Sequence, residues 1–166
     1  MAVSMIPRGK ILVSACFLGH PVRYDGQAKT LDRPLLQEWN ALGYLTLACP
    51  ELAGGLPVPR QAAEIVGGQG LEVLNGTAEV FNRAGYNVSS YFLEGAHKTL
   101  QMALHHGVIA AFLKQRSPSC GTREAYDGTF SGQVITGIGV TAALLQQKGI
   151  PAFGEDQWDK LLSFVT

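Results

Sequence analysis

KILVSA, residues 10–15, and YLTLA, residues 44–48, are two short apolar runs that flank a helical pattern, and together they decide the fold class. Each run has the length and apolar character of a strand that is buried on both faces. Between them, Pro34 suits the first turn of a helix and Gly43 suits its end. Because a helix connects the two runs, the strands are expected to be parallel.

The same alternation of strands and helices continues toward the C-terminus. The predicted elements are a helix that ends at Gly107, a strand over Val108–Leu113, a helix around Val140–Lys148, a strand over Ile150–Phe153 and a helix over about residues 156–165. This pattern predicts an α/β fold of the Rossmann-like type, with a mainly parallel sheet of about four strands flanked by helices. The whole chain, residues 1–166, is expected to be a single domain.

Two long loops and a hairpin interrupt this pattern. The loops span residues 49–70 and 114–134. Loops of this length in a compact domain are usually functional. A small β-hairpin insertion is predicted over residues 71–82, around the turn pair Asn75–Gly76.

Composition indicates an ordinary globular protein without a strongly charged surface. Of 166 residues, 46% are hydrophobic and 16% are charged, and Lys+Arg and Asp+Glu both total 13. A formal net charge of zero gives no electrostatic reason for stable binding to nucleic acid or to an anionic membrane. We expect neither a membrane span, which needs roughly 20 apolar residues, nor a signal peptide, whose apolar run is not seen in residues 1–10. We expect a cytoplasmic protein that is a monomer or a small homo-oligomer.

The three cysteines occupy equivalent places in the predicted sheet. Cys16 follows the first strand, Cys49 follows the second, and Cys120 lies in the loop that leaves the third. Sites in sheets of this kind lie at the carboxyl ends of the strands, so the three thiols are expected to meet at one edge. An odd number of cysteines in a reducing compartment is not a disulfide framework. Buried apolar thiols, metal ligands or a nucleophile remain as interpretations.

A metal centre is one interpretation with a definite chemistry. Structural zinc would need four ligands, typically in paired C-x-x-C spacing, which is absent, and only His20 lies near a cysteine in sequence. Three thiolates without a fourth partner suit a [4Fe–4S] cluster with one open iron. The alternatives are a cluster-free thiol enzyme that uses Cys16 or Cys120 as nucleophile, a non-catalytic iron–sulfur sensor, and a small-ligand binding protein.

Long ordered motifs extend over nearly the whole chain. They are ILVSACFLG, VRYDG, ACPELAGGLPVPR, AEI, FLEGA, LKQRSPSCG, YDGTFSG and GIGVTAALLQQKGI. In this order they resemble the thiouracil desulfidases. The resemblance implies an oxygen-sensitive [4Fe–4S] cluster on Cys16, Cys49 and Cys120, whose open iron binds the sulfur of the substrate without net redox change. It also implies substrates such as 2- or 4-thiouracil or 4-thiouridine monophosphate, with uracil or its nucleotide and hydrogen sulfide as products.

Four residues near the cysteines are candidates for catalysis. Glu51 lies two residues beyond Cys49 and is the expected general base, with Asp25 as the next candidate. Ser117 and Ser119 flank Cys120 and are expected to hydrogen-bond the substrate or the attacking water. A phosphate of a nucleotide substrate would need a cation, for which the candidates are Arg23, Lys29, Arg60, Lys114 and Arg123. The expected partner is therefore a small thiopyrimidine.

Overall fold

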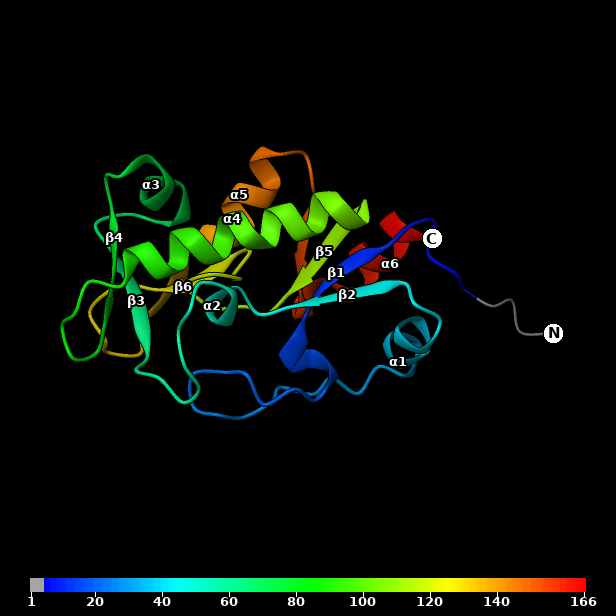
Figure 1. Cartoon of the computed structure of the whole chain (residues 1–166), viewed down its shortest axis with the longest axis horizontal. Coiled ribbons are helices and arrows are strands. Elements are labelled where there is room, and N and C mark those ends of the chain that lie inside the picture. Colours follow the sequence, from blue (N-terminus) through cyan, green and yellow to red (C-terminus); the bar gives the residue numbers. More distant parts are fainter. Residues whose placement is uncertain (1–4) are drawn as a thin grey trace.

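Four parallel strands form the central sheet of the computed structural model, which describes residues 5–166. They are β1 (Ile11–Ser14), β2 (Leu45–Ala48), β5 (Ala110–Leu113) and β8 (Ala152–Gly154). Their order across the sheet is β2-β1-β5-β8, and each neighbouring pair is parallel (Figure 1). The register places Ile11 opposite both Leu45 and Ala110. The predicted parallel sheet is confirmed.

Side chains of the strands alternate between two hydrophobic clusters, one on each face of the sheet. Leu12 and Ala111 point into one cluster, which α4 and α5 cover. Ile11 and Phe112 point into the other, which α1 and α6 cover. These helices are α1 (Pro34–Ala41), α4 (Ser89–His106), α5 (Val140–Gln147) and α6 (Trp158–Val165). Figure 1 shows α4 and α5 on one side of the sheet and α1 on the other.

Shorter elements surround the carboxyl edge of the sheet. They are the 3₁₀ helices η1 (Ala15–Leu18) and η2 (Glu155–Gln157), the helices α2 (Pro50–Ala53) and α3 (Gly70–Asn75), and the strands β3 (Ala63–Val66), β4 (Glu79–Asn82), β6 (Glu124–Tyr126) and β7 (Val134–Thr136). Strands β3 and β4 form one antiparallel ribbon, and β6 and β7 form another. No helix within residues 5–166 has both the length and the apolar character to cross a membrane.

The predicted hairpin over residues 71–82 is only partly correct. A small antiparallel ribbon is present, but β4 pairs with β3, which lies in the predicted loop 49–70. The segment Leu71–Leu74, predicted as a strand, is part of helix α3. Gly76 adopts a left-handed conformation with φ of 81° and ends that helix. The Asn75–Gly76 pair therefore serves as a helix stop, a role that the same residues fill as readily as a hairpin turn.

Helices α2 and α4 approach each other so closely that their contact requires glycine on both sides. A Cβ atom on Gly95 of α4 would lie 2.0 Å from the carbonyl oxygen of Pro50. A Cβ atom on Gly54, which ends α2, would lie 1.9 Å from the carbonyl oxygen of Tyr91. Helix α2 carries Glu51 and follows Cys49 directly. The long helix α4 therefore fixes the position of both residues through backbone contact.

We expect Gly95→Ala to lower the free energy of unfolding by about 2 kcal/mol. Alanine gains roughly 1 kcal/mol in helix propensity over glycine, but overpacking costs up to about 3 kcal/mol, and here the obstacle is backbone. Urea denaturation of the reduced, metal-free protein measures the change. Lys98→Ala on the exposed face of α4 is the control, with an expected change within about 0.5 kcal/mol. A Gly95→Ala protein as stable as the wild type would show that the helices separate at little cost.

Candidate active site

The structure brings the three cysteines together around one cavity. Cys16 lies in η1 directly after β1, Cys49 directly follows β2, and Cys120 lies in the loop that leaves β5. All three thiols are free, and all three residues line a cavity of about 270 Å³. This convergence follows from the parallel sheet, because its strands end at a common edge.

Burial determines the protonation of these thiols in the metal-free chain. It raises the pKa of Cys16 to about 11, although the charge of Lys114 acts in the opposite direction. It raises the pKa of Cys120 to about 12, although a hydrogen bond from Ser119 lowers that pKa. Burial also raises the pKa of Cys49. Near neutral pH these groups are therefore neutral thiols, and a bound metal would displace their protons.

The donor set suits a multinuclear metal centre better than a single ion. Within residues 5–166, no three side chains of His, Cys, Asp or Glu converge closely enough to hold one metal ion. In a cluster each thiolate binds a different iron atom, so the three thiols need not meet at one point. Cys16, Cys49 and Cys120 line this one cavity and would be the residues to hold such a cluster, and the lining includes no further cysteine and no histidine. His20 is exposed and lies outside this lining.

Glu51 and the serines beside Cys120 form one hydrogen-bonded group in the cavity wall. Ser119 Oγ donates to Glu51 Oε2 at 3.0 Å, and Ser117 Oγ lies 3.4 Å from the same oxygen. Arg60 Nε donates to Glu51 Oε1 at 3.0 Å in an ion pair whose side chains are only 5% and 14% exposed. Both oxygens of the Glu51 carboxylate are thus held by named donors.

The hydrogen bonds of Ser117 give this group a direction. Ser117 Oγ accepts the backbone N–H groups of Ser119 and Cys120 at 3.2 and 3.1 Å, which occupies both of its lone pairs. Its own proton then points to Ser119 Oγ, 2.9 Å away. Ser119 Oγ consequently donates onward to Glu51 Oε2, and Cys120 Sγ lies 3.6 Å from the same hydroxyl. The chain of donors therefore runs from the backbone of the Cys120 loop to Glu51.

Asp25, the second candidate base, lies outside this group. Its Oδ1 accepts the backbone N–H of Gln27 at 3.0 Å, and its Oδ2 lies 3.9 Å from Arg23 Nη1. Asp25 is exposed and is not among the residues that line the cavity. The structure therefore places it in a turn of the loop that follows η1.

The five candidate cations for a phosphate separate into two groups. Arg23, Arg60 and Lys114 line the cavity, whereas Lys29 and Arg123 do not. Arg60 is largely occupied, because besides Glu51 it donates to the carbonyl oxygens of Pro57 and Val22. These contacts make Arg60 an anchor for Glu51 rather than a free anion-binding group.

Sequence reasoning missed three charged residues of the cavity lining, namely Glu64, Arg83 and Arg116. Glu64 is the central residue of the AEI motif, and Arg116 lies four residues before Cys120 in the LKQRSPSCG motif. Both residues lie in motifs identified in the sequence, but no function was assigned to either residue. Arg83 follows β4 and carried no signal, because the ribbon that places it was predicted with the wrong partner strand.

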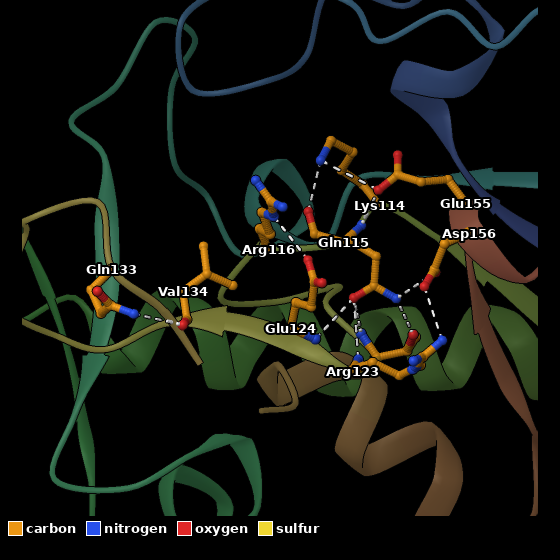
Figure 2. Close-up of polar contacts among 10 residues, drawn as sticks. Lys114, Gln115, Arg116, Arg123, Glu124, Gln133, Val134, Glu155 and Asp156 are labelled. Carbon is orange, nitrogen blue, oxygen red and sulfur yellow. Dashed lines mark hydrogen bonds and ion pairs between the residues drawn. The ribbon is translucent and has the colours of Figure 1, made fainter. Parts of the chain in front are cut away.

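A buried glutamine holds the loop that carries Cys120. Gln115 is 4% exposed and lies at the centre of the polar contacts in Figure 2. Its Oε1 accepts the backbone N–H groups of Thr122, Arg123 and Glu124 at 3.2, 3.1 and 3.1 Å. Its Nε2 donates to Thr122 Oγ1 at 2.6 Å. One side chain therefore closes the loop on which Ser117, Ser119 and Cys120 lie.

Glu155 connects this loop to the end of β8. Its Oε1 accepts the backbone N–H of Gln115 at 2.8 Å and lies 3.5 Å from Lys114 Nζ. Gly154 leaves the room that this arrangement needs, since a Cβ atom there would lie 1.8 Å from Gln115 Nε2. The loop is therefore fixed against the sheet by polar contacts with a glutamine and a glutamate (Figure 2).

Comparison with known proteins finds a matching family model, a related protein and a similar solved structure. A family model described as 2-thiouracil desulfurase matches residues 11–157. The Bacillus subtilis (strain 168) protein YbbK, itself uncharacterized, is 47% identical over 154 residues, which cover 92% of this chain and 99% of YbbK. The solved structure of the [4Fe-4S]-dependent thiouracil desulfidase TudS is 43% identical, with a TM-score of 0.86, and the match covers 95% of this chain and 100% of TudS.

Gln115→Leu should lower the free energy of unfolding by about 3 kcal/mol. The variant leaves three backbone N–H groups without their acceptor, and each buried unsatisfied group costs about 1–3 kcal/mol, although solvent can compensate part of this at Arg123. Chemical denaturation of the reduced, metal-free protein measures the change. Gln133→Leu is the matched control, because Gln133 is exposed and its side-chain amide bonds only the carbonyl oxygen of its neighbour Val134 among the described residues. Equal stabilities for the two variants would contradict the role of Gln115.

Proposed function

Because the chain belongs to the 2-thiouracil desulfurase family, we propose that it is a thiouracil desulfidase with a [4Fe–4S] cluster held by Cys16, Cys49 and Cys120. The family and the similarity to TudS support the activity. The observation that carries the proposal is that three free cysteines and the Glu51 group line the same cavity. A reducing cytoplasm would keep such thiols free for the cluster.

The proposed reaction is a hydrolysis without net redox change. When bound, the cluster supplies a Lewis-acidic iron without a protein ligand, which polarises a carbon–sulfur double bond and binds the departing sulfur. The oxygen of one water molecule replaces sulfur on the ring carbon, and the two hydrogens of that water leave with sulfur as hydrogen sulfide. Both 2-thiouracil and 4-thiouracil then yield uracil, and no electron donor is consumed.

Glu51 is the general base of this proposal. Its carboxylate accepts a proton from the attacking water, and Arg60 and Ser119 restrict the rotation of that carboxylate from both sides. Ser119 Oγ lies between Glu51 Oε2 and Cys120 Sγ. The Ser119 hydroxyl therefore holds Glu51 Oε2 on the side of the cavity where Cys120 lies. Ser117 keeps Ser119 oriented as a donor to Glu51.

The proposed substrates include 4-thiouridine monophosphate as well as free bases. Arg23, Arg83, Lys114 and Arg116 line the cavity, and guanidinium and ammonium groups are suited to a phosphate, although Lys114 and Arg116 also contact Glu155 and Glu124. Intact transfer RNA is not a proposed substrate, because a chain with zero formal net charge lacks the extended basic surface that RNA backbone binding needs.

The alternatives fit the cavity less well. A cluster-free thiol enzyme would need a thiolate near neutral pH, whereas burial raises the pKa of Cys16 to about 11 and that of Cys120 to about 12. A non-catalytic sensor or binding protein would have no use for a carboxylate that is fixed beside the cysteines by Arg60 and Ser119.

Anaerobically prepared protein should contain about four iron and about four sulfide per chain and should convert 2-thiouracil to uracil. Cys16→Ala, Cys49→Ala and Cys120→Ala should each lower the iron content and abolish turnover, since each removes one of three ligands. Ala62→Ser, in the same cavity lining, is the control and should keep a full cluster. Stoichiometric zinc without iron, or a cysteine variant with full iron content and full rate, would contradict the proposal.

Glu51→Gln should keep the cluster and a near-normal KM, while kcat falls by about 10²–10⁴-fold, the usual contribution of a general base. Glutamine keeps an oxygen for Arg60 but cannot accept the proton of the water. Steady-state kinetics with measured iron content provide the test. Glu94→Gln on the exposed face of α4 is the control and should leave kcat unchanged. A wild-type kcat in Glu51→Gln would assign the base to another group of the cavity.

A further inference from the structure

Glu64 is a buried carboxylate of the cavity that the mechanism above does not use. It lies in β3, is 7% exposed, and lines the same cavity as the three cysteines. A carboxylate is rarely buried to this extent without a compensating partner. Its contacts therefore indicate what it does.

One oxygen of Glu64 holds a loop. Oε1 accepts the backbone N–H of Gly128 at 2.9 Å and that of Phe130 at 3.2 Å, in the YDGTFSG motif between β6 and β7. Gly128 has φ of 91°, and a Cβ atom there would lie 2.6 Å from the carbonyl oxygen of Ile65, so this loop packs directly on β3. Tyr126 and Gly132, at either side of the loop, line the cavity. Glu64 Oε1 thereby fixes one wall.

The other oxygen has no partner among the residues that the structure describes. No hydrogen bond or ion pair within residues 5–166 involves Glu64 Oε2. Within residues 5–166, the side-chain oxygens that are both fully buried and without a hydrogen-bond partner are Thr99 Oγ1, Thr141 Oγ1 and Glu155 Oε2. Glu64 Oε2 is not among them, so it is not fully buried. Glu64 Oε2 therefore retains some accessible surface, which we assign to the cavity that Glu64 lines.

We propose that Glu64 is a specificity-determining residue whose Oε2 accepts a hydrogen bond from the N3–H group of the thiopyrimidine. This inference rests on the proposed function. An ionised carboxylate only accepts hydrogen bonds, so it selects a ligand N–H and repels a ring oxygen or a phosphate. The carboxylate thus also selects the orientation of the pyrimidine ring in which N3–H, rather than a ring oxygen, faces Glu64.

The chemistry of the substrates points to N3 among the ring nitrogens. N3 lies between C2 and C4, so its N–H neighbours the sulfur in 2-thiouracil and in 4-thiouracil alike. In a nucleotide the sugar occupies N1, and N3–H is then the remaining ring N–H. One acceptor at this place would therefore serve every substrate of the proposed function.

Methylated substrates and Glu64→Gln test the proposal together. In Glu64→Gln the amide oxygen still accepts the N–H groups of Gly128 and Phe130, while its NH₂ group replaces the acceptor that faces the cavity. For the wild-type holoenzyme, kcat/KM should be at least about tenfold higher for 1-methyl-4-thiouracil than for 3-methyl-4-thiouracil. Glu64→Gln should lose about 10- to 100-fold on the 1-methyl compound and nothing further on the 3-methyl compound.

The comparison of ratios removes steric effects, because the added methyl group is the same for both proteins. Glu64→Gln should keep the iron content and the melting temperature of the wild type. Glu38→Gln, an exposed carboxylate on α1 outside the cavity lining, should keep both rates. The same 1-methyl to 3-methyl ratio in wild type and Glu64→Gln overturns the proposal, and so do equal rates on both compounds in the wild type.

Failure of the proposed function gives a different result. A wild-type protein that carries its full cluster and converts no thiopyrimidine would refute the proposed activity. Calorimetric binding of 1-methyluracil and 3-methyluracil then tests Glu64 without turnover, and equal affinities would overturn its assignment. Should Glu64→Gln not fold, the two wild-type comparisons still decide the matter.

Discussion

The carboxyl ends of parallel strands lie at one edge of a sheet, and this constraint brings the three cysteines and Glu51 to the cavity. Cys16 is the second residue after β1, Cys49 directly follows β2, and the loop after β5 brings Cys120 to the same edge. Glu51 arrives with Cys49 because helix α2 starts there, and Gly95 lets α4 hold that helix by backbone contact. If neighbouring strands ran in opposite directions, the residues that follow them would lie at opposite edges of the sheet and would not share a cavity.

Buried polar side chains, rather than apolar packing alone, keep the loops of this edge in place. Gln115 closes the Cys120 loop, and Glu64 holds the segment between β6 and β7. Gln69 does the same for the approach to α5, since its Oε1 accepts the N–H of Ile138 at 2.9 Å and its Nε2 donates to the oxygen of Thr136 at 2.8 Å. Each of these three side chains forms hydrogen bonds with backbone groups that have no partner in a helix or a β-sheet.

The sequence predicted what depends on local periodicity and missed what depends on distant partners. The four parallel strands and the cysteine-lined edge follow from apolar runs that end at Cys16 and Cys49. The β3–β4 ribbon was not predictable in detail, because Asn75–Gly76 suits a helix end as well as a hairpin turn. The sequence also does not reveal that the guanidinium group of Arg60 donates its hydrogen bonds to Glu51 and to two carbonyl oxygens, because these partners meet only when the loop is folded.

The cavity has two walls of different origin. One wall, with Cys16, Cys49 and Cys120, is formed by segments that follow strands of the central sheet. The other wall, around Glu64, is formed by the short antiparallel ribbons β3–β4 and β6–β7. Both walls nevertheless join one hydrophobic core, because Ile65 of β3 and Val80 of β4 belong to the same buried cluster as Leu12 and Ala111 of the central sheet. A substitution that loosens the packing of the ribbon therefore acts on the shape of the cavity and on the stability of the whole fold together.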